Sequence, residues 1–182
     1  MDSRTFLQIK IPEIDLISLK EGYCLFFQWL PILIGLANLL AFFYTKELQL
    51  CVLGSGQLAT EFISVFLKYY FIYPRPEGAT RTDPGMPSSH AAWMAYTVVS
   101  LSFYSLRWNA ISSASLLSLF FSAILVGHSR ILAREHFFEQ VFFGYATGIT
   151  MALIWRFIGD HRLSVLTLTR LSSQFKLNYE LK

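Results

Sequence analysis

Charged side chains are scarce in this sequence. They account for only 15% of its 182 residues, whereas about a quarter of the residues in a soluble domain are charged. The hydrophobic fraction is 54% and the mean hydropathy is +0.45, so we expect lipid to be the main solvent of the fold. The net charge of +3 is too small to argue for nucleic acid, and we expect no such partner.

Cysteine is rare, and metal-ligand clusters and repeats are missing from the sequence. The two cysteines, Cys24 and Cys51, lie in apolar stretches, which excludes a disulfide framework. No carboxylate–histidine cluster has metal-ligand spacing, so we expect neither a metal nor another cofactor. A secretory signal is not indicated, because residues 1–21 carry charges before any long apolar run. We expect a single domain, because this length does not house two ordinary cores.

Long apolar runs, by contrast, dominate the sequence. A helix that spans a bilayer needs about 20 mostly apolar residues. Five such runs, the last of them short, cover residues 22–45, 48–67, 84–106, 108–129 and 137–155. We therefore predict an all-α fold, a polytopic membrane helical bundle with about five transmembrane helices.

The segments that flank these runs predict the domain organisation and the orientation. We divide the chain into an N-terminal segment, 1–21, that could lie at the membrane interface, a transmembrane domain, 22–158, and a basic tail, 159–182. Lys and Arg residues after the fifth run favour a cytosolic tail. The two long polar connections, 68–86 and 129–136, then lie on the opposite side, which puts the candidate site at one membrane face.

Positive charges gather in these two connections. Lys68 and Arg75 lie in the first, and Arg130 lies in the second. Charges so close to apolar spans are costly unless they have partners, so three cations at one end of a bundle predict an anionic ligand. A phosphoryl group fits, because a guanidinium can bind two of its oxygens and because its transition state spreads negative charge over them.

The beginning of the third run provides a second anion-binding feature. Pro87 is a residue type favoured at helix starts, and it is followed by Ser88 and Ser89. We predict that free N–H groups there, together with the two serine hydroxyls, bind phosphate.

Two histidines can divide the chemistry of phosphoryl transfer. One of His90 and His136 would attack phosphorus, and the other would protonate the leaving oxygen. Gln140 lies one helical turn after His136. Its carbonyl oxygen could accept the Nδ1–H of His136 and leave Nε2 free to attack.

Three sequence motifs contain these residues, in the order K-x6-R-P, P-S-x-H and S-R-x5-H, between residues 68 and 136. Together they resemble the signature of the type-2 phosphatidic-acid phosphatase superfamily, whose members are membrane phosphatases that need no metal. The resemblance implies that His136 is the nucleophile and His90 the general acid. It also implies that the other motif residues bind phosphate: Lys68, Arg75, Arg130 and the region of Ser88 and Ser89.

Two departures from the family pattern bear on the branch. Gln140 stands where the third motif often has Asp, and Ser89 stands where the second often has Gly. The glutamine resembles both dolichyldiphosphatases and glucose-6-phosphatases, and five spans argue against the latter, which are longer proteins with more spans. The segments 85–90 and 129–144 look most like dolichyldiphosphatases. This resemblance implies a polyprenyl diphosphate substrate, dolichyl diphosphate, which is hydrolysed to the monophosphate and inorganic phosphate. It also implies an endoplasmic reticulum protein that supports protein glycosylation, with its active site facing the lumen.

Two alternative functions remain open from the sequence. A broader lipid phosphate phosphatase would act on phosphatidate or undecaprenyl diphosphate. A non-enzymatic lipid-binding protein on the same scaffold would contact membrane lipids without turnover. The sequence does not indicate an oligomeric state.

Several charged residues near the motifs have more than one interpretation. Glu61, two turns before Lys68, predicts a buried ion pair or another polar contact within the bundle. Arg134 and Glu135 would contact a second phosphate, or pair with each other or with Asp83. We interpret Arg81 and Asp83 as loop residues, either of which could gate the pocket.

Overall fold

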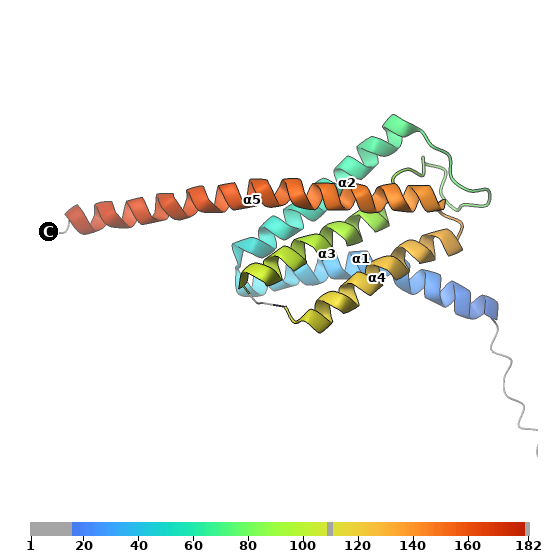
Figure 1. Ribbon diagram of the computed structural model, residues 1–182, viewed down its shortest axis with the longest axis horizontal. Coiled ribbons are helices and arrows are strands. Elements are labelled where there is room, and N and C mark those ends of the chain that lie inside the picture. Colours follow the sequence, from blue (N-terminus) through green and yellow to red (C-terminus); the bar gives the residue numbers. More distant parts are fainter. Residues whose placement is uncertain (1–15, 109–110, 181–182) are drawn as a thin grey trace, which may run out of the picture.

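A computed structural model describes residues 16–108 and 111–180 of the chain, and side chains within 18–106 and 111–159. These residues form five α-helices and no strand, so the predicted all-α fold is confirmed (Figure 1). The helices are α1 (Leu16–Thr45), α2 (Leu48–Phe71), α3 (Ser89–Trp108), α4 (Ser113–Leu132) and α5 (Phe138–Glu180).

The third helix begins later than predicted. Residues 84–88 were assigned to the third apolar run, but α3 begins only at Ser89. Two prolines and a glycine in this segment disfavour a helix interior. The N–H of Ser88 instead donates to the carbonyl of Gln140 at 2.9 Å. The segment therefore belongs to the polar connection and is tied to the beginning of α5.

Four of the five helices are long and apolar enough to cross a membrane. They are Ser18–Thr45, Leu48–Phe71, Ser113–Leu132 and the part Phe138–Gly159 of α5. Large apolar side chains on these helices are exposed, as expected for surfaces that face lipid rather than water. Among the described helices, only α3 is not apolar enough to be counted with these four. Its residues 91–97 are mostly buried. The other helices surround α3, so protein replaces lipid around it.

Small residues let α3 and α5 approach each other closely. A Cβ atom at Gly148 would collide with the main-chain oxygen of Ala92, and one at Gly144 would lie 2.5 Å from the main-chain oxygen of Ser88. Close approach at small residues is a common way for membrane helices to pack. This contact holds the first turn of α3 against the second and third turns of α5, and both helices carry candidate site residues in their first turns.

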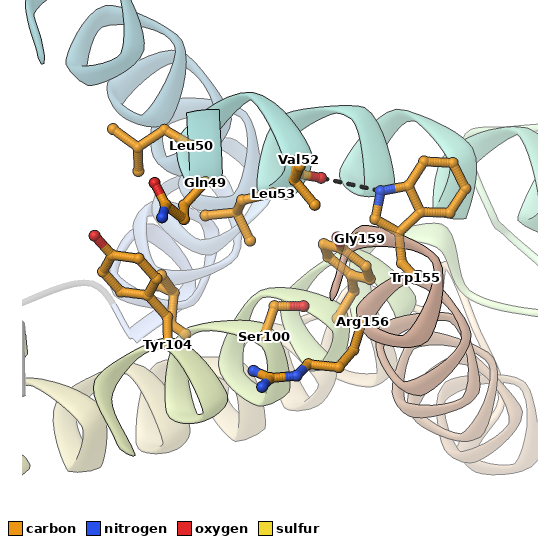
Figure 2. A pocket seen from close by; sticks show the side chains of 11 residues that line it. Gln49, Leu50, Val52, Leu53, Ser100, Tyr104, Trp155, Arg156 and Gly159 are labelled. Atoms are coloured by element: carbon orange, nitrogen blue, oxygen red, sulfur yellow. Dashed lines mark hydrogen bonds between the residues drawn. The ribbon is translucent and has the colours of Figure 1, made fainter. Parts of the chain in front are cut away.

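Hydrogen bonds between side chains and neighbouring helices add to this packing. The buried Gln57 amide donates to the Thr97 hydroxyl at 3.0 Å, which links α2 to α3. At the end of the bundle far from the candidate site, the indole N–H of Trp155 donates to the carbonyl of Val52 at 3.0 Å (Figure 2). A small cavity of about 70 Å³ lies beside this contact. Its lining comes from α2, α3 and α5, so these three helices meet at this end of the bundle.

The terminal segments extend away from this packed region. Residues 160–180 continue α5 as a helix that projects beyond the bundle (Figure 1). The basic tail predicted for 159–182 is thus largely a helical extension, and its cytosolic location stays a prediction. Most of the predicted interfacial segment, 1–21, lies outside the described residues, and its last six residues form the beginning of α1.

Candidate active site

The two polar connections meet at one end of the bundle. The ends of α2 and α4 lie there together with the beginnings of α3 and α5 (Figure 1). These elements surround a polar cavity that is lined by five charged residues, a serine and two histidines: Lys68, Arg75, Arg81, Ser89, His90, Arg130, Glu135 and His136. Six of the eight predicted site residues therefore line one cavity. Of the other two, Gln140 lies directly behind His136, and Ser88 is fully buried.

The amide of Gln140 has a fixed orientation. Its Nε2 donates to the carbonyl of Pro74 at 2.7 Å, and its Oε1 accepts the N–H of Phe137 at 3.2 Å. Main-chain groups of fixed polarity therefore orient Oε1 toward His136, whose Nδ1 lies 3.1 Å away. Because Oε1 can only accept, Nδ1 must carry the proton.

The other ring nitrogen of His136 gives the same assignment. Nη1 of Arg75 lies 3.3 Å from Nε2 of His136. A guanidinium group can only donate, so Nε2 accepts with its lone pair. Burial, and after it the charge of Arg75, lowers the pKa of His136 from 6.5 to about 3. The imidazole is therefore neutral at physiological pH, and its Nε2 lone pair is directed at Arg75, which lines the cavity.

Asp83 neutralises two of the predicted phosphate-binding cations. Its carboxylate lies 3.1 Å from Nζ of Lys68 and 3.0 Å from Nη2 of Arg75. Burial alone would raise the pKa of Asp83, but the hydrogen bonds and charges of Lys68 and Arg75 outweigh burial and lower it. The carboxylate thus holds the position on these cations that an anionic ligand would take.

The free space left in the polar cavity is small. Its volume is about 10 Å³, which is room for about one water molecule. A phosphoryl group therefore requires rearrangement of the lining. Asp83 is the group that can yield, because its side chain is 34% exposed and lies on the connection between α2 and α3.

Glu135 connects the two polar loops. Its carboxylate accepts hydrogen bonds from the N–H and the hydroxyl of Thr80. Its main-chain oxygen accepts from Nη1 of Arg75 at 2.8 Å. Burial alone would raise the pKa of Glu135, but these Thr80 hydrogen bonds and the nearby Arg75 charge lower it. Arg134 is exposed and lines neither this cavity nor the groove described below.

Arg130 connects the site to α1. Its Nη2 donates to the carbonyl of Cys24 at 3.1 Å, and its Nη1 lies 3.4 Å from Oε1 of Gln28. Lys68, in the last turn of α2, pairs with Asp83 and not with Glu61 among the ion pairs of the described residues. The buried pair considered for Glu61 is therefore wrong, because the loop brings a carboxylate closer to Lys68.

The two serines at the start of α3 differ in position. Ser89 lines the polar cavity, whereas Ser88 is fully buried and does not line it. Neither hydroxyl has a hydrogen-bond partner among the described residues. The N–H of Ser88 is not free to bind an anion, because it donates to the carbonyl of Gln140; the other N–H groups predicted to bind phosphate at this helix start stay a prediction. The orphaned hydroxyl of Ser89 suits an anionic ligand, since a buried polar group without a partner is costly.

A larger apolar groove opens next to the polar cavity. It has a volume of about 700 Å³ and lies between α1 and α2. Its walls come mainly from residues 31–42 and 50–61. At the end next to the polar cavity it reaches Arg81, Ser89 and His90. The groove can take a long apolar chain whose polar end lies at the histidines.

The PAP2 superfamily matches residues 49–162, which is more than half of the chain. The chain belongs to the PAP2 superfamily. This assignment confirms the resemblance carried by the three motifs.

Curated relatives within the PAP2 superfamily are named dolichyldiphosphatases. The chain is 29% identical to Dolichyldiphosphatase 1 of Mus musculus over 89% of its own length. It is 31% identical to the Dolichyldiphosphatase of Saccharomyces cerevisiae over 79% of its length. These alignments cover 73% and 64% of the two relatives, and another match, a fusion protein, is covered to only 22%.

A solved structure shares the fold. It is a transmembrane PAP2-type phosphatidylglycerolphosphate phosphatase from Bacillus subtilis, with a TM-score of 0.55 and 22% sequence identity. The alignment covers 83% of this chain and 80% of that one. At this level of identity the likeness supports the helical arrangement alone.

The PAP2 motifs located most of the cavity, but three of its features were missed. Asp83 was expected to be a loop residue that could gate the pocket, but its pairing with Lys68 and Arg75 was not predicted. Glu135 was expected to pair with Arg134 or to contact a phosphate. The carbonyl of Cys24 was not considered as a partner of Arg130. The one available signal was the density of charges in residues 77–83, since charges beside apolar spans usually have partners.

Proposed function

We propose that this PAP2 protein hydrolyses a polyprenyl diphosphate, such as dolichyl diphosphate, to the monophosphate and inorganic phosphate. The observation that supports this most directly is the state of His136. Its Nδ1 proton is held by Gln140, so the Nε2 lone pair lies among Lys68, Arg75 and Arg130. A neutral nucleophile surrounded by cations suits attack on an anionic phosphoryl group.

In the proposed reaction, Nε2 of His136 attacks the terminal phosphorus. The bond between this phosphorus and the bridging oxygen breaks, and its electron pair stays on that oxygen, which remains on the lipid monophosphate. His90, in its protonated form, gives its proton to this oxygen. Water then attacks the phosphohistidine and returns a proton to His90, the N–P bond breaks, and orthophosphate leaves.

The groove between α1 and α2 supports a lipid substrate. It is mostly apolar and continues to His90 at its polar end, so an isoprenoid chain would lie there with its diphosphate in the polar cavity. The choice of dolichyl diphosphate rests on the relatives' names and on Gln140. Phosphatidate would fit the same chemistry and would make the protein a broader lipid phosphatase.

We further propose that the site faces the lumen of the endoplasmic reticulum and that the basic tail is cytosolic. Hydrolysis there would return the lipid carrier for protein glycosylation. Metal independence is part of the proposal.

Phosphate release tests this function. The purified protein should release phosphate from dolichyl diphosphate faster than from phosphatidate, with a chelator present. His136→Ala should abolish release. His128→Ala is the matched control, because His128 is exposed and its Nδ1 contacts the Tyr23 hydroxyl at 3.0 Å, outside the cavity. Preference for phosphatidate would move the assignment to a broader phosphatase. Activity that survives in His136→Ala would refute the nucleophile.

A further inference from the structure

The polar cavity and the apolar groove share three residues. Arg81, Ser89 and His90 line both. The other cavity residues lie on the side of His136, and the other groove residues come from α1 and α2, with Trp93 from α3. These three residues therefore form a junction between the place where phosphorus reacts and the place where the lipid chain lies.

Arg81 is the basic residue of this junction, and its charge is available. Lys68 and Arg75 are paired with Asp83, and Arg130 donates to carbonyl oxygens of α1. Arg81 makes no ion pair or hydrogen bond with any residue in the described ranges. Its positive charge nevertheless lies close enough to interact with His90 and Arg130.

A lipid diphosphate has a second phosphate between the reacting phosphorus and the chain. If the terminal phosphate lies beside His136 and the chain lies in the groove, this second phosphate lies at the junction. We propose that Arg81 binds the lipid-attached phosphate and thereby selects diphosphates over monophosphates. This inference rests on the proposed function, and it names the residue that recognises the substrate class.

Arg81 also acts on the reaction step in this proposal. When the bond from the terminal phosphorus to the bridging oxygen breaks, the electron pair stays on the lipid-attached phosphate. A guanidinium at that phosphate stabilises the charge that develops there. Loss of Arg81 should therefore lower kcat as well as raise KM, since the contact strengthens in the transition state.

Arg134 is the natural alternative for this role and the natural control. From the sequence, Arg134 and Glu135 were the residues considered for contact with a second phosphate, whereas Arg81 was interpreted as a loop residue that could gate the pocket. The structure places Arg134 on the exposed side of its turn, where it lines neither the cavity nor the groove. Arg81→Gln and Arg134→Gln remove the same charge from the same end of the bundle, but only the first changes the junction.

The test compares farnesyl diphosphate with farnesyl monophosphate, because the two share a chain and differ by one phosphate. Arg81→Gln should lower kcat/KM for the diphosphate by about 10- to 100-fold, the range of a charge-assisted hydrogen bond. It should change the monophosphate value by less than about 3-fold, the size of a weak exposed charge effect. Arg81→Lys should recover part of the loss, and Arg134→Gln should resemble the unmodified protein.

A binding measurement makes the result independent of turnover. Methylenediphosphonate and orthophosphate are titrated while thermal unfolding in detergent is followed. Arg81→Gln should weaken the stabilisation by the diphosphonate and leave that by orthophosphate unchanged. Equal weakening of both ligands, or an equal effect of Arg134→Gln, overturns the role of Arg81. Absence of turnover in the unmodified protein would refute the proposed function, while the diphosphonate titration would still decide the role of Arg81.

Discussion

Replacement of Asp83 by Asn should make the protein bind phosphate more tightly. The carboxylate lies on Lys68 and Arg75 at 3.1 and 3.0 Å, and the cavity beside it has room for about one water molecule. An incoming phosphoryl group must therefore displace Asp83 from these cations. Asn has nearly the same shape and keeps one acceptor oxygen, but it removes the competing charge.

The expected magnitude follows from the contacts that the ligand has to replace. A hydrogen bond to a charged group contributes about 1.5–3 kcal/mol, so the inhibition constant for orthophosphate should fall by about 10- to 100-fold. The protein without ligand should lose stability at the same time. The side chains of Lys68 and Arg75 are only 6% and 4% exposed, and Asp83→Asn removes their ionic partner.

The assay is inhibition of lipid hydrolysis by orthophosphate and vanadate, together with thermal unfolding with and without each anion. Glu77→Gln is the matched control, because Glu77 is an exposed acid on the same connection. Asp83→Asn should melt lower without anion and regain stability when anion is added. Weaker or unchanged inhibition in Asp83→Asn would refute the reasoning, since it would mean that Asp83 positions the cations rather than competing for them.

Three further predictions concern His136 and its support. Because His136 has a pKa of about 3, protonation of the nucleophile should not lower kcat/KM between about pH 5 and 7. Gln140→Glu places a carboxylate at Nδ1 and should raise the pKa of His136, so that kcat/KM of this variant falls with decreasing pH within this window. The pKa of His136 in the folded protein lies below its unfolded value of 6.5, so the unfolded state binds more protons as the pH falls from 6.5 toward 3. Over this range the melting temperature should therefore fall more in the unmodified protein than in His136→Asn. Gly85→Ala would place a Cβ atom 2.6 Å from Oε1 of Gln140; it should lower kcat by about 100-fold, whereas Gly22→Ala, which meets nothing within 4 Å, should not. A retained kcat in Gly85→Ala, a pH profile unchanged by Gln140→Glu, or equal acid sensitivity in His136→Asn would contradict the respective prediction.

The sequence predicted the helices and the meeting of the two loops for identifiable physical reasons. Apolar runs of membrane length leave little choice but helices, because lipid offers no hydrogen-bond partners to the backbone. With helices of similar length, consecutive connections alternate between the two ends. Lys68 and Arg130 lie in last turns of helices, and Gln140 lies in a first turn, so their convergence follows from span counting.

The interior of the loops could not be predicted in this way. The hydropathy pattern does not show that residues 72–88 fold back until Asp83 meets Lys68, because that path depends on single hydrogen bonds. One of these joins the N–H of Gly85 to the carbonyl of Tyr73 at 2.8 Å. Likewise, the contact of Arg130 with the carbonyl of Cys24 spans 106 residues of sequence. Such contacts depend on tertiary packing and leave no periodic signal.

The central position of α3 was also hidden from the sequence. Its apolar run is as long as those of the other spans, yet α3 lies inside the bundle. The other four helices are long and apolar enough to cross a membrane. The small residues that allow this, such as Gly144 and Gly148, lie on α5. Their effect becomes visible only when both helices are placed together.

Trapping of the covalent intermediate tests the central claim most directly. Dolichyl diphosphate labelled in its terminal phosphate is mixed with the protein and quenched within milliseconds in alkali, in which phosphohistidine is stable. The account predicts label on the peptide that contains His136, its loss in His136→Asn and its retention in His128→Asn. Turnover without any labelled peptide, or label on a different residue, would contradict the assignment of His136 as the nucleophile.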